Sequence, residues 1–190
     1  MNSDNKIDRK EAIKRTGLLL GGVVFAPNIL GVLKGCTAAP GDWDPVLFSS
    51  GQARVATTLS DVILPADDTP SASEVGVPQF IETMVNEVYS EEDREQFLDG
   101  LDAFASDFES EYGKSFYDAT EDERYEFTYQ VNRRAVEEND GPFFLRFKEL
   151  TMLGYFTSEV GATQVLRYEA NPGMYDGCMP LDEVGRTWAT

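Results

Sequence analysis

Apolar residues recur at helical spacing through most of the chain. After Ser49 and Ser50 they fall three and four positions apart as far as Ile63, and Pro65 then ends the pattern. The same spacing returns in four later segments, which begin at Val77 or Pro78, after Ser90, after Thr120 and at Phe143. No stretch alternates as a β-strand does, and no internal repeat is present. The pattern predicts a mainly α fold, a small single-domain bundle of about five to six helices.

Start and stop signals place the ends of these helices. Ser90 precedes three acidic residues that suit a helix N-terminus, and Gly113 suits the C-terminus of the same helix. Thr120 and Glu123 have the spacing of a capping box. The helix that they open runs to about Glu138, and the next runs from Phe143 to about Thr157. The residues predicted to face inward from this last helix are Phe144, Phe147, Leu150, Thr151 and Leu153.

Two segments lack a long helical pattern. Residues 63–78 form a loop that contains three prolines and Gly76. A short helical segment follows Ser158 and ends near Leu166. The turn residues between Asn171 and Pro180 then predict an irregular C-terminal segment that wraps the bundle.

The first 35 residues have the features of an export signal. A basic head precedes an apolar block, residues 17–33, which is too short for a comfortable membrane span and is interrupted by Pro27. The alternative is an amphipathic or buried N-terminal helix, but the apolar residues do not keep to one face. Arg9, Lys10, Ile13 and Lys14 resemble the twin-arginine pattern, which carries folded proteins. Lys10 replaces the usual second arginine, so the route for unfolded chains stays open.

Cys36 ends a sequence, Leu33-Lys34-Gly35-Cys36, that resembles a bacterial lipoprotein box. Lys34 is unusual there. Lipidation would make Cys36 the first residue of the mature chain and anchor it through acyl chains. The alternative is a disulfide between Cys36 and Cys178. We expect a signal peptide over residues 1–35, a tether over 36–48 and a helical domain over 49–190, exported as a periplasmic protein or a membrane-anchored lipoprotein facing the periplasm.

Charge and composition exclude several functions. Six of the 16 basic and three of the 34 acidic side chains lie in the first 35 residues, so the remainder carries 10 and 31, a formal charge of −21. Such a body repels nucleic-acid phosphates and anionic lipids, so any membrane attachment must come from a lipid anchor. The sequence contains no histidine. It therefore lacks the commonest general base, the commonest metal ligand and every Ser-His or Cys-His dyad.

The residues alone indicate no catalytic, cofactor-binding or metal site. Asp67 and Asp68, with Glu74 nearby, are the closest approach to a carboxylate cluster, but their spacing matches no EF-hand loop. We interpret these aspartates as acceptors for backbone amides of their own loop. Cys178 has no basic neighbour in sequence to activate it. An enzyme would need a carboxylate or tyrosine mechanism.

Three stretches resemble the gluconate 2-dehydrogenase subunit 3 family. Residues 58–78 are similar to its opening motif, and residues 153–161 and 168–178 to its closing motif, so that the resemblance covers roughly 50–181. It implies a non-catalytic small subunit that binds a large FAD-dependent dehydrogenase of the glucose-methanol-choline type, acting on a sugar or sugar acid. A cytochrome c subunit with haem c often completes such a complex. The resemblance further implies that the small subunit escorts the folded flavoprotein through export and helps to hold it at the membrane.

The motifs also supply a docking hypothesis, because loops on a rigid scaffold often carry binding. Its residues are Pro65, Asp67, Asp68, Glu74, Gly76, Tyr155, Ser158, Glu159, Gly161, Pro172, Gly173 and Tyr175. The alternative is that these residues shape the fold of the domain itself. The alternative function is a free-standing exported lipoprotein or ligand-binding module, with a pocket lined by phenylalanine and tyrosine and no flavoprotein partner.

Overall fold

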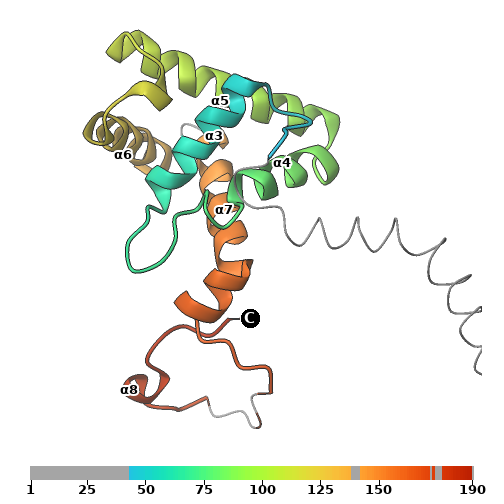
Figure 1. Cartoon of the computed structure of the whole chain (residues 1–190), viewed down its shortest axis with the longest axis vertical. Helices are drawn as coiled ribbons and strands as arrows, with labels where there is room; N and C mark the ends of the chain where they lie inside the picture. The colour runs from blue at the N-terminus through green and yellow to red at the C-terminus, as the bar shows by residue number, and fades with distance from the viewer. Residues whose placement is uncertain (1–42, 138–141, 172, 174–176, 190) are drawn as a thin grey trace, which may run out of the picture. The chain divides into compact units, whose positions relative to one another are not determined.

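The computed structural model describes residues 43–137, 142–171, 173 and 177–189 (Figure 1). These residues are mainly helical, as the hydrophobic pattern predicts. The β-pairing found among them is one isolated bridge, between Arg167 and Trp188. Some residues singled out in the sequence lie outside the described residues: Arg9, Lys10, Ile13, Lys14, Cys36, Pro172 and Tyr175. None of the described helices is both long and apolar enough to cross a bilayer.

Local capping signals set the helix ends close to their predicted places. The elements are α3 (Ser50–Ile63), α4 (Val77–Glu87), α5 (Glu91–Tyr112), η1 (Phe116–Asp118), α6 (Glu121–Glu137), α7 (Pro142–Thr157), η2 (Gly161–Val165) and α8 (Leu181–Val184). Ser49 and Gln52 form a capping box at α3, and Ser90 Oγ accepts a hydrogen bond from the N–H of Asp93 at α5. Gly113 ends α5 with φ of +68°, a conformation that favours glycine.

Helix α7 organises the core, because it packs against α3, α4, α5 and α6 (Figure 1). Bulky aromatic rings fill the space between these helices. Phe97, Phe108 and Phe147 are almost completely buried, and the Phe108 ring meets those of Phe116 and Phe127 edge-on at 5.1 Å. Edge-on contacts between rings add to the stabilisation that burial gives, so this cluster ties α5, η1 and α6 together.

The expectation that Leu153 faces inward is wrong. Leu153 is 45% exposed, whereas its neighbours Gly154 and Tyr155 are buried. At Gly154 an added Cβ would lie 2.6 Å from the Phe80 ring, so this glycine lets α7 approach α4 closely. The inward-facing residues of α7 therefore continue from Thr151 to Tyr155, four positions later, and do not include Leu153.

The segment before α3 is fixed by a buried carboxylate. Glu82 of α4 is 6% exposed, and its Oε1 accepts hydrogen bonds from the backbone N–H groups of Leu47 and Phe48 at 2.7 and 2.9 Å. A carboxylate that accepts two backbone donors compensates for much of its lost hydration. This contact fixes the start of the described domain against α4.

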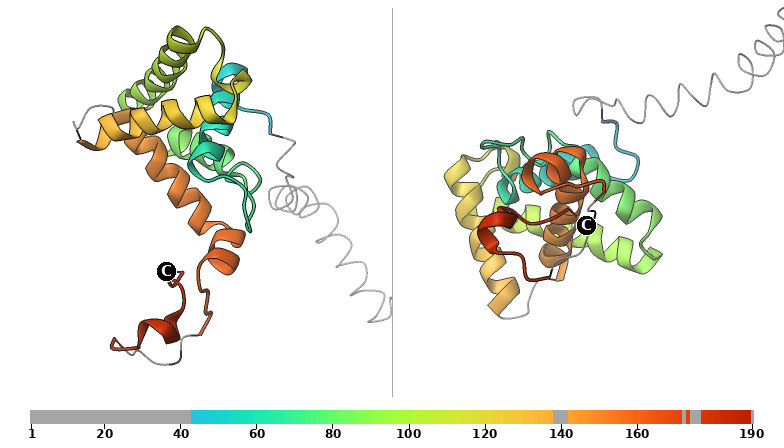
Figure 2. Two further views of the ribbon diagram at one scale, coloured as in Figure 1. Left: turned by 90° about the vertical axis from the view of Figure 1, so that its left-hand side faces the viewer. Right: turned by 90° about the horizontal axis from the view of Figure 1, so that it is seen from below.

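The C-terminal segment is irregular, as expected, but it folds back on itself and does not wrap the bundle. It lies beyond the C-terminal end of α7 (Figures 1 and 2). The Arg167 N–H donates to the Thr187 carbonyl at 2.8 Å, and the Ala189 N–H donates back to Arg167 at 2.9 Å. The Arg167 guanidinium also lies over the Trp188 ring at 4.0 Å. The segment thus closes on Arg167, just after η2.

Candidate functional site

The loop between α3 and α4 is held in one conformation by its own backbone and by two carboxylates. The Ala72 N–H donates to the Leu64 carbonyl at 3.0 Å, which closes residues 65–71 into a lobe. Asp61 accepts bonds from the N–H and hydroxyl of Ser73, both at 2.8 Å, and Glu74 accepts one from the Ser71 N–H at 2.8 Å. The loop is long, but several of its backbone N–H groups find acceptors within the loop or at the end of α3.

Asp67 and Asp68 have different surroundings. The Asp67 carboxylate accepts bonds from the N–H and hydroxyl of Thr69, at 2.9 and 3.0 Å, and this backbone bond lowers the pKa of Asp67. The interpretation of Asp67 as an acceptor for its own loop is therefore confirmed. Asp68 is exposed, and no described residue hydrogen-bonds to its side chain. For Asp68 the interpretation is wrong, and its carboxylate faces solvent.

Tyr155 joins the loop to α7. Its side chain is 4% exposed, and its hydroxyl donates to the Pro70 carbonyl at 2.8 Å and lies 3.1 Å from Thr69 Oγ1. The same Thr69 bonds to Asp67. A chain of contacts therefore runs from the end of α7 to the tip of the loop. The structure brings together residues of the opening and closing motifs that are 85 positions apart in sequence.

Ser158 and Gly161 shape the turn that leaves α7. The Ser158 hydroxyl donates to the Tyr155 carbonyl at 2.6 Å and accepts from the Gly161 N–H at 3.0 Å. A Cβ at Gly161 would lie 1.9 Å from the Tyr155 carbonyl oxygen. Only glycine fits so close to the backbone, so these residues position Tyr155.

The other proposed docking residues lie at separate places. Gly76 precedes α4 with φ of +82°, Gly173 is exposed in the C-terminal segment, and Glu159 is exposed just beyond α7. The exposed part of the loop consists of Pro65–Asp68, here called the loop crest, and of Glu74. The surface that remains for a partner is therefore acidic at the loop and at Glu159.

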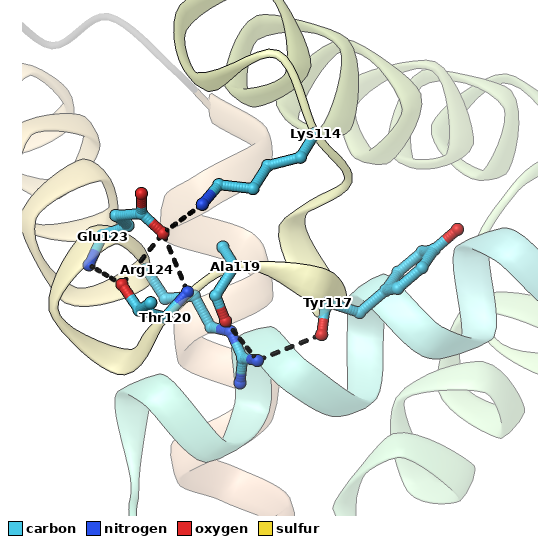
Figure 3. A network of polar contacts seen from close by, with 6 residues as sticks. All are labelled: Lys114, Tyr117, Ala119, Thr120, Glu123 and Arg124. Carbon is cyan, nitrogen blue, oxygen red and sulfur yellow. Dashed lines mark hydrogen bonds and ion pairs between the residues drawn. The ribbon is translucent and has the colours of Figure 1, made fainter.

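The most strongly shifted carboxylate lies elsewhere, at the start of α6 (Figure 3). Lys114 Nζ lies 2.8 Å from Glu123 Oε2, which also accepts bonds from the N–H and hydroxyl of Thr120. Lys114, followed by these two bonds, lowers the pKa of Glu123 to about 2. The Arg124 guanidinium caps η1 by donating to the carbonyls of Tyr117 and Ala119, at 3.0 and 2.7 Å. The shift marks a predicted capping box that ties α5, η1 and α6 together.

The chemistry of the described residues offers no ready metal site. No group of three or more carboxylate or cysteine side chains among them is placed to hold a metal ion. Cys178 is exposed. The arrangement around Tyr155 positions a loop and does not bring a nucleophile and a base together.

The sequence indicated no location for two features, although a pocket lined by phenylalanine and tyrosine was among the hypotheses. A cavity of about 470 Å³ lies between α5, α6 and α7, with Phe97, Phe104, Phe127 and Phe143 in its walls and Arg134 and Arg146 among its polar residues. A second, smaller hollow lies beside two exposed tyrosines of α6, Tyr125 and Tyr129. The four-residue spacing of the tyrosines was the available signal. The cavity had none, because its walls come from three helices.

The comparisons with known proteins identify the family. The model of the family described as gluconate 2-dehydrogenase subunit 3 matches residues 50–173, from the start of α3 into the C-terminal segment. No curated protein and no solved structure matches the chain. The match includes the loop, Tyr155 and the turn after α7, and the family name denotes one subunit of a dehydrogenase that has several. The chain belongs to the gluconate 2-dehydrogenase subunit 3 family.

Proposed function

We propose that this chain is the non-catalytic small subunit of an exported dehydrogenase complex. It binds a large FAD-dependent subunit of the glucose-methanol-choline type, which acts on a sugar or sugar acid, and escorts it through export. A cytochrome c subunit with haem c is a further candidate partner. Family membership supports the subunit role, and the lack of histidine in the sequence favours a binding role over a catalytic one.

The escort role has a physical rationale. Flavin loads onto a folded protein, so a folded flavoprotein without its own signal needs the export address of a partner. The basic head and apolar block of this chain supply such an address, and a lipidated Cys36 would anchor the complex at the membrane. Mass spectrometry of the mature N-terminus tests this step. An acylated Cys36 supports it, whereas a mature protein that retains Met1 contradicts it.

The observation that carries the docking role is the link between Tyr155 and the loop. Bonding to Pro70 and Thr69 holds the loop crest in place before any partner arrives. A preorganised loop pays less conformational entropy on binding than a mobile one. The loop crest carries Asp68, whose side chain forms no hydrogen bond with a described residue. This exposed carboxylate suits a contact with a basic group on another protein.

Purification of the tagged chain from membranes of the producing cell tests the proposal. A flavin-containing protein should be retained with the wild-type chain. Asp68→Asn should reduce the retained flavin without changing the unfolding temperature, because the exposed Asp68 side chain forms no hydrogen bond or ion pair with a described residue. Glu95→Gln, on the exposed face of α5, is the matched neutralisation and should retain flavin as the wild type does. If no flavoprotein accompanies the wild-type chain, the subunit role fails.

The cavity between α5, α6 and α7 favours a second candidate function, a ligand-binding module. A volume of about 470 Å³ and phenylalanine walls suit an apolar molecule. Asp99 and Asp107 also line the cavity and Arg146 is paired with Asp93, so Arg134 is the residue that could meet an anionic group. The dye 8-anilinonaphthalene-1-sulfonate has that chemistry. Strong binding of the dye to the wild-type chain and weak binding to Arg134→Gln, together with no retained flavoprotein, would favour this function.

A further inference from the structure

A small hollow opens beside two stacked, exposed tyrosines, and it is here called the tyrosine pocket. Its volume is about 160 Å³, and its walls come from α3, α6 and α7. The residues used below are Ile63, Tyr125, Thr128, Tyr129, Asn132 and Lys148. Tyr125 and Tyr129 are 62% and 50% exposed, with ring centroids 6.2 Å apart. Exposed tyrosines beside a hollow are typical of the central part of a protein interface.

Thr128 contributes a polar atom in need of a partner. Its side chain is 6% exposed, and no described residue pairs with its Oγ1. Other helical threonines here donate to the carbonyl four residues back, as Thr57 does at 2.8 Å and Thr151 at 2.9 Å. A buried hydroxyl without a partner costs free energy that a bound polar group would recover. Because Oγ1 itself has almost no accessible surface, a ligand reaches it only after the Thr128 side chain turns towards the hollow that it lines.

Size and polarity limit what the tyrosine pocket can accept. An engineered protein cavity of about 150 Å³ binds benzene, so about 160 Å³ accommodates one aromatic ring. Lys148 Nζ already donates to Asn132 Oδ1 at 2.8 Å, so the ammonium is engaged at the wall. Histidine and tyrosine both combine a single ring with a group that can hydrogen-bond to the Thr128 hydroxyl. Tyrosine fits better here, because its six-membered carbon ring has the size and apolar character of benzene.

The surroundings of the tyrosine pocket are acidic. Glu121, Asp122 and Glu126 are exposed on α6 within about one turn of Tyr125. On the other side, the loop crest begins two residues after Ile63 and carries Asp68. The chain from residue 36 onwards has a formal charge of −21. The nearby cations, Arg133 and Lys148, lie towards the Tyr129 end, so the acidic part of this face is the Tyr125 end. Arginine or lysine on a partner surface would complement that end.

We propose that the tyrosine pocket is the docking point for the large flavoprotein subunit, which inserts one tyrosine from a segment rich in arginine or lysine. The inserted ring packs against Tyr125 and Tyr129, its hydroxyl bonds to Thr128 Oγ1, and the basic residues meet Glu121, Asp122 and Asp68. The proposal rests on the proposed function and gives it a location. It also combines the loop crest and α6 into one surface.

Two variants of the full chain test the assignment, with flavin retained per tagged chain as the readout. Tyr125→Ala/Tyr129→Ala should retain at least about thirtyfold less, the loss expected of an interface hot spot. Its unfolding temperature should stay unchanged because both side chains are exposed. Thr128→Val should raise the unfolding temperature of the isolated chain, since it removes the buried hydroxyl, and yet retain about tenfold less flavin. Tyr168→Ala is the control, since Tyr168 is 60% exposed and lies outside the tyrosine pocket.

A crosslink identifies the occupant. With a photoreactive benzoylphenylalanine at position 129, irradiation of membranes should join this chain to the flavoprotein at a peptide containing tyrosine and basic residues. The same group in place of Ser106, on the exposed face of α5, should give no such product. A crosslink from position 129 to a second copy of the chain overturns the assignment, as does wild-type flavin retention by both variants. If the wild-type chain retains no flavoprotein, the proposed function and this assignment fail together.

Discussion

Replacing Tyr155 by Phe should release the loop from α7 while keeping the packing of the ring. The change removes one oxygen, which lies 2.8 Å from the Pro70 carbonyl and 3.1 Å from Thr69 Oγ1. Tyr155 is 4% exposed, and its ring meets the Phe156 ring edge-on. Neither its burial nor this ring contact depends on the hydroxyl. The experiment therefore isolates the contribution of a polar contact between the two family motifs.

The expected cost is about 1–2 kcal/mol. A hydrogen bond within a protein contributes about 0.5–1.5 kcal/mol net, and a partly buried carbonyl left without its donor adds to that loss. For a domain of this size, 1 kcal/mol lowers the unfolding temperature by about 4 °C. With a urea slope of about 2 kcal/mol per molar, the midpoint should fall by roughly 0.5–1 M and the slope should not change.

Urea unfolding of Tyr155→Phe beside Tyr168→Phe provides the measurement, because Tyr168 is 60% exposed and its hydroxyl should contribute little. Amide exchange at Ala72, whose N–H closes the loop on Leu64, should also accelerate. A midpoint that moves no further than that of the control would show that the Tyr155 hydroxyl does not hold the loop. The account of a preorganised loop crest would then be refuted.

Three further changes test other parts of the structure. Gly161→Ala should destabilise the domain by at least about 2 kcal/mol because its Cβ would meet a backbone oxygen. Gly51→Ala, on α3, should be neutral or stabilising, because its Cβ would meet only Ser49 Oγ, at an ordinary contact distance of 4.0 Å. Thermal unfolding compares the two variants. Glu82→Ala should cost about 2 kcal/mol through the loss of two bonds to backbone N–H groups, and Glu87→Ala, exposed on the same helix, should not. The pKa of Glu123 is about 2 in the folded protein against 4.5 ordinarily, so its stabilising effect is present above pH 4.5 and is lost as the pH falls towards 2. A curve of unfolding free energy against pH for Glu123→Gln should lack that part of the acid dependence. A curve that matches the wild type would contradict the assignment.

Helix ends were predictable because the signals are local. Ser90, Gly113 and the pair Thr120 and Glu123 act on backbone groups within four residues of themselves. Their effect does not depend on how the rest of the chain packs. Leu153 shows the limit of the same reasoning. The pattern predicted that this apolar residue faces inward. Instead Gly154, which packs against Phe80, and Tyr155, which bonds to the loop, face inward, and Leu153 faces solvent.

The contacts that define the candidate site join distant parts of the sequence. Tyr155 meets Pro70 across 85 residues, and the tyrosine pocket combines side chains of α3, α6 and α7. No periodicity or motif encodes such proximity, because it follows from the packing of α7 against its neighbours. The resemblance nevertheless drew attention to residues 58–78 and 153–161, which the structure joins through Tyr155 and Pro70. That these segments bind a partner stays a prediction.

Burial divides the residues of the docking hypothesis between its two interpretations. Tyr155 and Gly161 are buried, and with Ser158 they hold the turn after α7 and the loop in place, so their role in shaping the domain accounts for them. Asp68 and Glu159 are exposed on that frame, and folding of the domain gives no reason for either. We therefore predict that the docking interpretation applies to the exposed residues of these motifs and the structural interpretation to the buried ones. Variants of the buried group should lower stability and binding together, and variants of the exposed group should lower binding alone.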